Sequence, residues 1–197
     1  MGKLVYFSQK DKRWKDVMYS IRNDKKQTIG TSACGPTSAA MAISSLIGQT
    51  VLPTTAAAYA LNNGYRTIDT GTSWDFFVSI AKNYGVACKQ TDSLREIKKA
   101  LSDGKIVIAS MDKGNFTGDG HYILLVGISN KNGETWINVF DPNHSNTKYG
   151  TDGLIDQGIK NDGKVSAKEI VFVKQAKQYW IFSHQTKEDE DETGGRQ

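Results

Sequence analysis

The spacing of apolar residues changes about halfway along the chain, and the first half has a helical pattern. Within residues 36–47 the apolar positions recur at i, i+4, i+7 and i+8, which places them on one helical face (Ala39, Ile43, Leu46 and Ile47). Pro36 suits the first turn of this helix, and Gly48 suits its end. Similar signals predict helices at residues 53–62, 74–84 and 93–103, with Thr72 or Ser73 capping the second and Ser93 the third.

The second half has short apolar runs separated by turn residues. These runs predict strands at residues 106–110, 121–129, 136–141, 170–173 and 179–182, with a glycine-rich loop at residues 113–120. In the first half, strands are expected only at residues 4–7 and 86–88, and residues 10–33 are expected to be irregular apart from a helical turn. Helices followed by antiparallel strands indicate the α+β class.

Composition indicates one domain with a short acidic tail. The length of 197 residues suits a single domain, which we place at residues 1–187. Residues 188–197 contain a run of five acidic residues and a Gly-Gly pair without any apolar side chain, so they are expected to be a disordered tail or a linker stub. Without this tail the chain has 24 basic and 16 acidic residues, a net charge near +8. Such a body favours anionic partners, although the charge also serves solubility.

Several classes of protein fit poorly. No basic run is interleaved with aromatic residues, so a nucleic-acid partner is not expected. No apolar run approaches the roughly 20 residues of a membrane span, and the N-terminus lacks the long apolar core of a signal peptide. We therefore expect a protein that is made soluble without a signal peptide and does not insert into membranes. Oxygen-rich stretches lack the spacing of a calcium loop, so neither a metal nor a cofactor is predicted.

Cys34 is the candidate nucleophile. A thiol becomes nucleophilic as a thiolate, and a helix N-terminus or a nearby imidazolium lowers its pKa. Cys34 directly precedes Gly35-Pro36 and the small residues of the first helix, so it lies where the helix begins. A plain buried thiol is the alternative for Cys34. The second cysteine, Cys88, lies in an apolar run and is expected to be a core residue, with a disulfide as the minor alternative.

The base should be a histidine on another element. His121 follows Gly118-Asp119-Gly120 and opens a buried strand, so it would be held firmly at the edge of a cleft. His144, in a loop, and His184, near the end of the last strand, are the less favoured candidates.

Asp141 is the candidate to orient the histidine, because a carboxylate that accepts from the imidazole sets its tautomer. A three-residue loop between the two strands, residues 131–133, would place Asp141 opposite Ile123 on the face that carries His121. A two-residue turn would place it on the other face. The catalytic interpretation therefore predicts an odd-length loop, and the alternative is that Asp141-Pro142 merely begins a turn.

The tetrahedral oxyanion of an acyl-transfer reaction needs hydrogen-bond donors. The backbone N–H of Cys34 is one candidate, and the side-chain amide of Gln9 or Gln27 is a second. The residues alone do not choose between the two glutamines.

Together these motifs resemble those of papain-fold cysteine peptidases. The chain is similar to stand-alone relatives of the double-glycine leader peptidases of bacteriocin exporters, as found in phage endolysins. The resemblance covers most of residues 4–183 and rests on four segments, namely Gln9-Lys10-Asp11-Lys12-Arg13-Trp14, residues 29–37 around Cys34, Gly120-His121-Tyr122 and Val139-Phe140-Asp141-Pro142. Ala33 departs from the glycine or other small residue that is expected there.

This resemblance implies a papain-like fold, with the helical half packed on an antiparallel sheet. It also implies that Cys34 is the nucleophile, His121 the base, Asp141 the orienting residue and Gln9 the oxyanion amide. Near these residues, Gly120, Asp119 and Trp14 become candidates for contact with the substrate.

The resemblance further implies an amide bond of bacterial cell-wall peptides as the substrate, cut by an endopeptidase or amidase that acts on the wall after release from the host. The acidic tail would lead to a missing wall-binding module. Cleavage of a protein or leader peptide is the first alternative, and a non-catalytic binding module is the second. The oligomeric state is left open.

Overall fold

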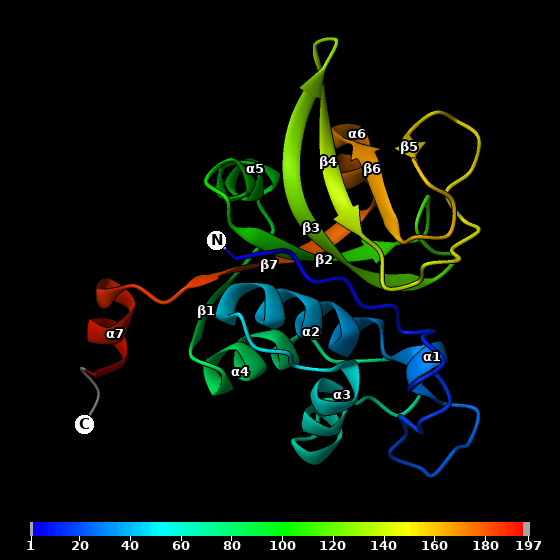
Figure 1. The fold of residues 1–197 in the computed structure, drawn as a ribbon, viewed down its shortest axis with the longest axis vertical. Helices are drawn as coiled ribbons and strands as arrows, with labels where there is room; N and C mark the ends of the chain where they lie inside the picture. The colour runs from blue at the N-terminus through cyan, green and yellow to red at the C-terminus, as the bar shows by residue number, and fades with distance from the viewer. Residues whose placement is uncertain (1, 195–197) are drawn as a thin grey trace.

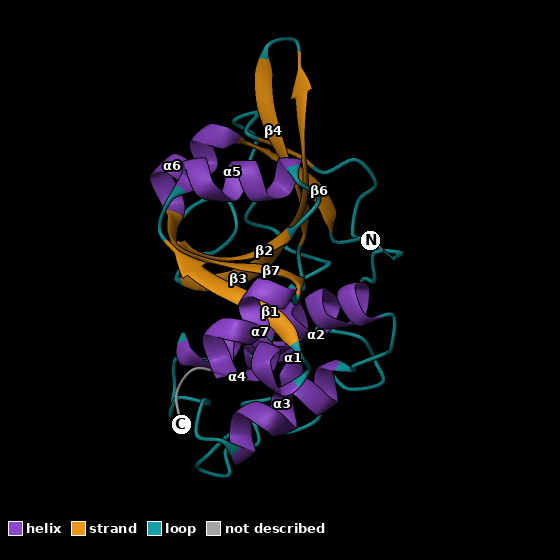
Figure 2. Ribbon diagram, turned by 90° about the vertical axis from the view of Figure 1, so that its left-hand side faces the viewer, coloured by secondary structure: helices purple, strands orange, loops and turns teal. Residues whose placement is uncertain are grey.

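A seven-stranded antiparallel sheet lies between two groups of helices (Figures 1 and 2). The computed structural model describes residues 2–194. The helices are α1 (Ile29–Ser32), α2 (Cys34–Ile47), α3 (Pro53–Asn62), α4 (Asp75–Asn83), α5 (Leu94–Ser102), α6 (Glu169–Gln175) and α7 (Lys187–Gly194). The strands are β1 (Val86–Thr91), β2 (Ile106–Asp112), β3 (Gly120–Lys131), β4 (Glu134–Phe140), β5 (Ile155–Asp156), β6 (Lys164–Lys168) and β7 (Ala176–His184).

The strand order in space is β1-β7-β2-β3-β4-β6-β5. The last long strand of the chain, β7, is therefore inserted between β1 and β2 and pairs antiparallel with both. β1 follows α4 in the helical half, so β7 joins that half to the rest of the sheet. The predicted α+β architecture, a helical half packed on an antiparallel sheet, is confirmed.

Each face of the sheet has its own apolar core. Helices α2 to α4 cover one face, and α5 and α6 cover the other (Figure 2). Small side chains allow α2 to approach the sheet closely, because Ala39, Ala40 and Ala42 are fully buried. Aromatic side chains form part of the core on the α2 side of the sheet. The ring of Phe77 packs between those of Tyr122 and Trp180, at centroid distances of 4.9 and 4.5 Å.

Most helices occur where local sequence signals predict them. Gly48 ends α2 with a φ of 70°, as expected for a glycine in the left-handed region. The side chain of Ser93 caps α5 by accepting from the backbone N–H of Glu96 at 3.1 Å. The expected cap of α4 is wrong, because its N-cap residue is Trp74, and neither Thr72 nor Ser73 occupies that position.

Two predicted strands are wrong. Residues 4–7 are extended but belong to no strand, and they are tied down by contacts such as the bond from the Val5 backbone N–H to Ser45 Oγ at 2.9 Å. Residues 170–173 lie in helix α6, where Val171 and Phe172 are buried while Val173 is 61% exposed. A short apolar run fits either element, and here a helix buries its two middle residues and leaves Ile170 and Val173 exposed. The pattern also missed β5 and β6.

The acidic tail was expected to lack regular structure, but its described part forms helix α7. This helix projects from the end of the molecule opposite α1 (Figure 1). The remaining tail residues, 195–197, lie outside the described residues. Among residues 2–194, no helix is both long and apolar enough to cross a membrane.

The hairpin of β3 and β4 contradicts the expected odd-length loop. Its turn has two residues, Asn132 and Gly133, both with positive φ (53° and 80°), and Lys131 pairs with Glu134. Between Leu125 and Gly127 the register shifts by one residue, so that Val126 is an extra residue in β3. Beyond this bulge Leu124 pairs with Phe140, which is the register that the three-residue loop was meant to produce. The bulge, rather than the turn, therefore sets the side of the sheet on which Asp141 lies.

Deleting Val126 should consequently separate His121 from Asp141. Without this residue, the side chains on one side of the deletion point to the opposite face of the sheet. We expect the alkylation rate of Cys34 at pH 6 to fall at least about tenfold. Inserting one glycine after Asn132 is the matched control, since a longer turn at the hairpin tip leaves the ladder below it intact. A deletion variant that is folded by circular dichroism and is alkylated at the parental rate would contradict this role of the bulge.

Candidate active site

Cys34 is the first residue of α2, so its sulfur lies at the positive end of a 14-residue helix dipole. The helix begins at Cys34 itself, two residues before the predicted start at Pro36. The preceding short helix α1 ends at Ser32, and Ala33, in a non-helical conformation, separates the two helices. Cys34 is neither fully buried nor fully exposed as a residue.

Gly35 allows two neighbours to approach the nucleophile closely. A Cβ atom at this position would lie 3.2 Å from the Cβ of Thr72 and 3.2 Å from a ring carbon of Tyr122. The hydroxyl of Tyr122 in turn donates to the backbone oxygen of Thr72 at 2.7 Å. The glycine after Cys34 is therefore required by packing against the loop between α3 and α4 and against β3.

His121 and Asp141 meet at the ends of β3 and β4, as the bulged register requires. The distance from His121 Nε2 to Asp141 Oδ1 is 2.7 Å. Since Nε2 is bound to the carboxylate, Nδ1 is the ring nitrogen left to face Cys34. The two side chains are 9% and 0% exposed, so the pair is shielded from water.

The carboxylate of Asp141 accepts four hydrogen bonds. Besides His121, Oδ1 accepts from the backbone N–H of Asn143 at 2.8 Å. Oδ2 accepts from the Asn146 amide at 2.9 Å and from the Tyr149 hydroxyl at 2.8 Å. Burial alone would raise the pKa of Asp141, but the charge of His121 and these donors hold it below its usual range. Asp141 therefore stays ionised.

The electrostatics of the site favour a thiolate–imidazolium pair. Burial alone would raise the pKa of the Cys34 thiol. The charge of His121, a hydrogen bond from its ring and the backbone N–H of Tyr122 outweigh this effect and lower the pKa. For His121, burial alone would lower the pKa, but the charges of Asp141 and Cys34 raise it above its ordinary value. A thiolate positioned in this way can attack a carbonyl carbon.

The two candidate oxyanion amides have different surroundings. Gln9 is 5% exposed, and its Nε2 donates to the backbone oxygen of Gly30 at 3.0 Å, in the short helix that leads to Cys34. Nε2 of Gln27 instead donates to Ile68 O and Asp69 Oδ1, at 3.1 and 3.2 Å, in the loop after α3. These contacts do not test either amide as an oxyanion donor, so the role of Gln9 that the family resemblance implies stays a prediction.

The three candidate substrate contacts occupy different places. Gly120 and Asp119 are exposed and directly precede His121, so they remain candidates. Trp14 is 3% exposed, and its indole N–H donates to the backbone oxygen of Ser8 at 2.8 Å. Little of its surface is left for a substrate, and a contact between Trp14 and the substrate stays a prediction. Its bulky ring instead holds the turn that carries Gln9.

The other histidines and the second cysteine lie elsewhere. His144 Nδ1 shares a 2.6 Å hydrogen bond with Ser8 Oγ, which ties its loop to the N-terminal segment. His184 and Cys88 line a cavity of about 1030 Å³ between β1, β7, α5 and α7. Both cysteines are free, so the disulfide alternative is excluded, and burial raises the pKa of Cys88 to about 12.

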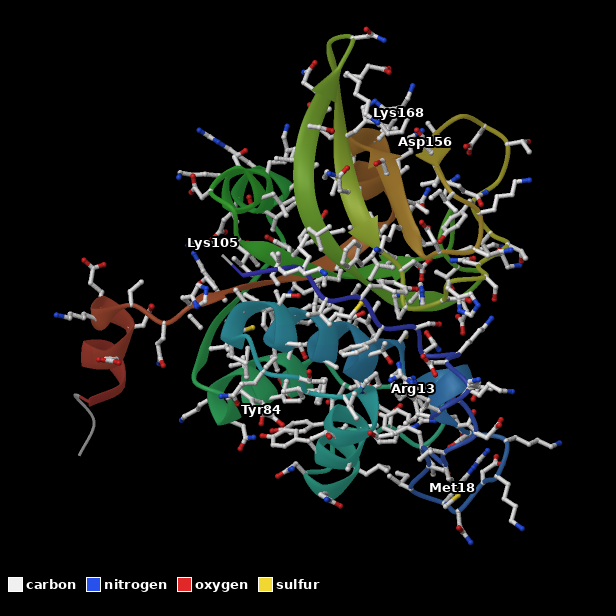
Figure 3. All side chains as sticks on the ribbon, viewed as in Figure 1. Arg13, Met18, Tyr84, Lys105, Asp156 and Lys168 are labelled. Atoms are coloured by element: carbon white, nitrogen blue, oxygen red, sulfur yellow. The ribbon has the colours of Figure 1, made fainter. Side chains whose placement is uncertain are left out.

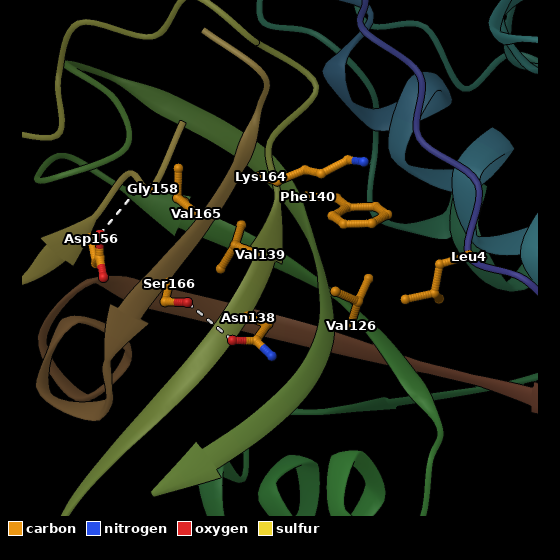
Figure 4. Close-up of a pocket in the computed structure, with 10 residues that line it drawn as sticks. All are labelled: Leu4, Val126, Asn138, Val139, Phe140, Asp156, Gly158, Lys164, Val165 and Ser166. Carbon is orange, nitrogen blue, oxygen red and sulfur yellow. Dashed lines mark hydrogen bonds between the residues drawn. The ribbon is translucent and has the colours of Figure 1, made fainter. Parts of the chain in front are cut away.

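A smaller cavity of about 350 Å³ lies over β4 and β6, beside Leu4 of the N-terminal segment (Figure 4). Phe140 and Val126 contribute to its wall, while Cys34, His121 and Asp141 do not. No group of three or more metal-ligating side chains occurs within residues 2–194.

Several residues of the site were missed by sequence reasoning. Asn146 and Tyr149 follow Asp141 in one loop, so the polar run after Asp141-Pro142 was a usable signal. Tyr19 and Thr72 come from distant segments, and the 2.6 Å bond between their hydroxyls joins them next to Gly35. No spacing in the sequence links these two segments.

Alkylation by iodoacetamide should distinguish the two cysteines. At pH 6 we expect Cys34 to react at least about 100-fold faster than Cys88, because its lowered pKa leaves far more thiolate. The rate at Cys34 should fall as the pH drops through its pKa. Peptide mass spectrometry measures both rates in one sample, and equal slow rates would indicate a site without a thiolate.

Replacing Asp141 by Asn should impair catalysis, although the asparagine side chain fills the same space as the aspartate. Asn146 and Tyr149 keep acceptors, but the imidazolium loses its counter-charge and His121 its preferred tautomer. We expect peptidase activity to drop on the order of 10²–10⁴-fold. Asp156→Asn, an exposed carboxylate on β5, serves as the control. An Asp141→Asn variant with near-parental activity would show that Asp141 merely begins a turn.

Comparisons with known proteins agree with this geometry. No curated protein matches the chain significantly. Its fold is similar to the peptidase domain of Streptococcus ComA, a bifunctional ABC transporter involved in a quorum-sensing pathway (TM-score 0.55, 17% identity, 79% of this chain and 93% of that one). It is also similar to a protein described as a C39-like peptidase from Bacillus anthracis (TM-score 0.52, 15% identity, 80% and 91%). The sequence model of the Peptidase_C39 like family matches residues 4–162, so the chain belongs to this family of cysteine peptidases.

Proposed function

We propose that this cysteine peptidase hydrolyses amide bonds in the peptides of bacterial cell walls, as the catalytic domain of a phage lysin does. The observation that carries its chemistry is the buried His121–Asp141 pair beside the sulfur of Cys34. An endopeptidase is the main form of the proposal, and an amidase would use the same attack.

In the proposed mechanism, the Cys34 thiolate attacks the carbonyl carbon of the scissile bond. The backbone N–H of Cys34 and the amide of Gln9 stabilise the oxyanion that forms. His121 donates its proton to the leaving amine, which departs and leaves an acyl-enzyme. A water molecule then gives a proton to His121 and attacks the thioester, so that the thiolate leaves and the acid product is released. Asp141 keeps the ring in place throughout.

The charge of the molecule supports a polyanionic surface as the place of action. The acidic helix α7 extends from the opposite end to the Cys34 end of α2 (Figure 1). Basic side chains occur instead at Lys148, close to Gly118 in the loop before His121, and in the turn after Gln9, where Arg13 lies near α1 (Figure 3) and pairs with Asp11 at 2.9 Å. Gram-positive walls are rich in anionic polymers, so this charge would concentrate the enzyme near its substrate.

Cleavage of a leader peptide or another protein is the second candidate. It is favoured by the similarity of fold to the ComA peptidase domain, which shares only 17% identity with this chain. The same triad chemistry serves either substrate, so the products must decide between them.

Digestion of purified Gram-positive walls tests the proposal. The parental protein should release soluble fragments whose masses and new amino termini identify one cleaved peptide bond. Cys34→Ala should reduce this release by at least about 10³-fold, because the nucleophile is lost. Cys88→Ala is the matched control and should keep the parental rate.

Clearing of walls by the Cys34→Ala variant would refute the thiolate mechanism. If the parental protein leaves the walls intact but cleaves leader-type or unrelated peptides, the result favours a peptidase that acts on a leader peptide or another protein.

A further inference from the structure

The loop between α3 and α4 carries a buried cation next to the candidate active site. Arg66 is 2% exposed, although arginine is rarely buried without a charged partner. Its Nε donates to the backbone oxygen of Tyr19 at 2.9 Å, and its Nη1 donates to the backbone oxygens of Thr67 and Gly71 at 2.9 and 2.8 Å. All of these acceptors are neutral carbonyls.

No carboxylate compensates the guanidinium directly. Among the described side chains, those of residues 2–190, none forms an ion pair with Arg66, and its Nη2 is buried without a hydrogen-bond partner. The acid closest in effect is Asp69, but that side chain is 51% exposed and pairs with Arg22 at 2.8 Å. A buried charge held only by neutral groups is costly unless another charge balances it.

Short contacts lead from Arg66 to the nucleophile. The guanidinium lies 4.8 Å from the ring centroid of Tyr19, whose hydroxyl bonds to Thr72 Oγ1 at 2.6 Å. The backbones of Arg66 and Thr72 form a β-bridge, and Thr72 packs against Gly35, the residue after Cys34. The charge of Cys34 also acts on Arg66 and on Tyr19, in the direction that the proximity of these contacts to Gly35 leads one to expect.

The charges of the candidate site do not cancel without this arginine. The thiolate of Cys34, the imidazolium of His121 and the carboxylate of Asp141 sum to one negative charge in a buried setting. The guanidinium of Arg66 brings that sum to zero.

We propose that Arg66 is a positioning residue that supplies the second counter-charge of the Cys34 thiolate. It acts through the field of its guanidinium and through the Tyr19–Thr72 contact that holds the nucleophile, and it need not touch the substrate. This inference rests on the proposed function, since it assumes that Cys34 works as a thiolate.

The pH dependence of Cys34 alkylation tests the proposal. Arg66→Met should raise the midpoint of the rate profile by about one pH unit, because an opposite charge near the thiolate is lost. Arg66→Lys, which keeps the charge, should restore much of the difference. Arg95→Met is the matched control: it removes an exposed arginine from α5, on the other face of the sheet, and should leave the midpoint unchanged. A folded Arg66→Met protein with the parental midpoint would overturn the proposal.

A second measurement is available if Arg66→Met does not fold. In the double variant His121→Ala/Asp141→Asn, both the main counter-charge and the like charge of Asp141 are gone, and Arg66 should still hold the Cys34 midpoint below the ordinary thiol value of about 8.5. A midpoint above that value, as burial alone would produce, rules out the second counter-charge. If the parental protein itself has a midpoint of about 8.5 or higher, the thiolate mechanism is refuted. Failure of the proposed function can thus be distinguished from failure of the role of Arg66.

Discussion

The buried carboxylate of Asp141 ties together parts of the chain that are far apart in sequence. Its oxygens accept from His121 and from the loop through Asn146 and Tyr149. Its own backbone N–H donates to Gly163 at 2.7 Å, and its backbone oxygen accepts from Tyr6 at 2.7 Å. A carboxylate without any exposed surface needs a hydrogen-bond donor for each of its lone pairs. Asp141 therefore fixes the positions of all the segments that supply these donors. The order of the site follows from that requirement.

Features that depend on neighbouring residues were predictable. Periodicity, caps and glycine stops identified α2, α3 and α5, because a helix is decided largely by contacts within a few residues. The short run at residues 170–173 was misread because its β-branched residues suit a strand, whereas its helical form depends on which side chains the rest of the protein covers.

The face of the sheet on which Asp141 lies was predicted correctly, but for an incorrect reason. The parity between His121 and Asp141 depends on every residue between them, including the extra one at Val126. The Asn-Gly pair pointed to a two-residue turn, and Gly127 inside an apolar strand was a signal for a bulge that went unused. The Arg66 and Thr72 loop left no comparable signal, because its meeting with Gly35 is visible only in three dimensions.

The position of β7 also sets the order in which a growing chain can become a working enzyme. The ribosome releases the segment with Cys34 early and those with His121 and Asp141 much later. Among the described strands, β1, which follows the helical half, pairs with β7 alone, and β7 is made after the other six strands of the sheet. A nascent chain therefore carries its reactive sulfur before the sheet that fixes the helices against the strands of His121 and Asp141 is complete. Translation timing itself thus delays full assembly of the peptidase fold until the last strand of the sheet has been added.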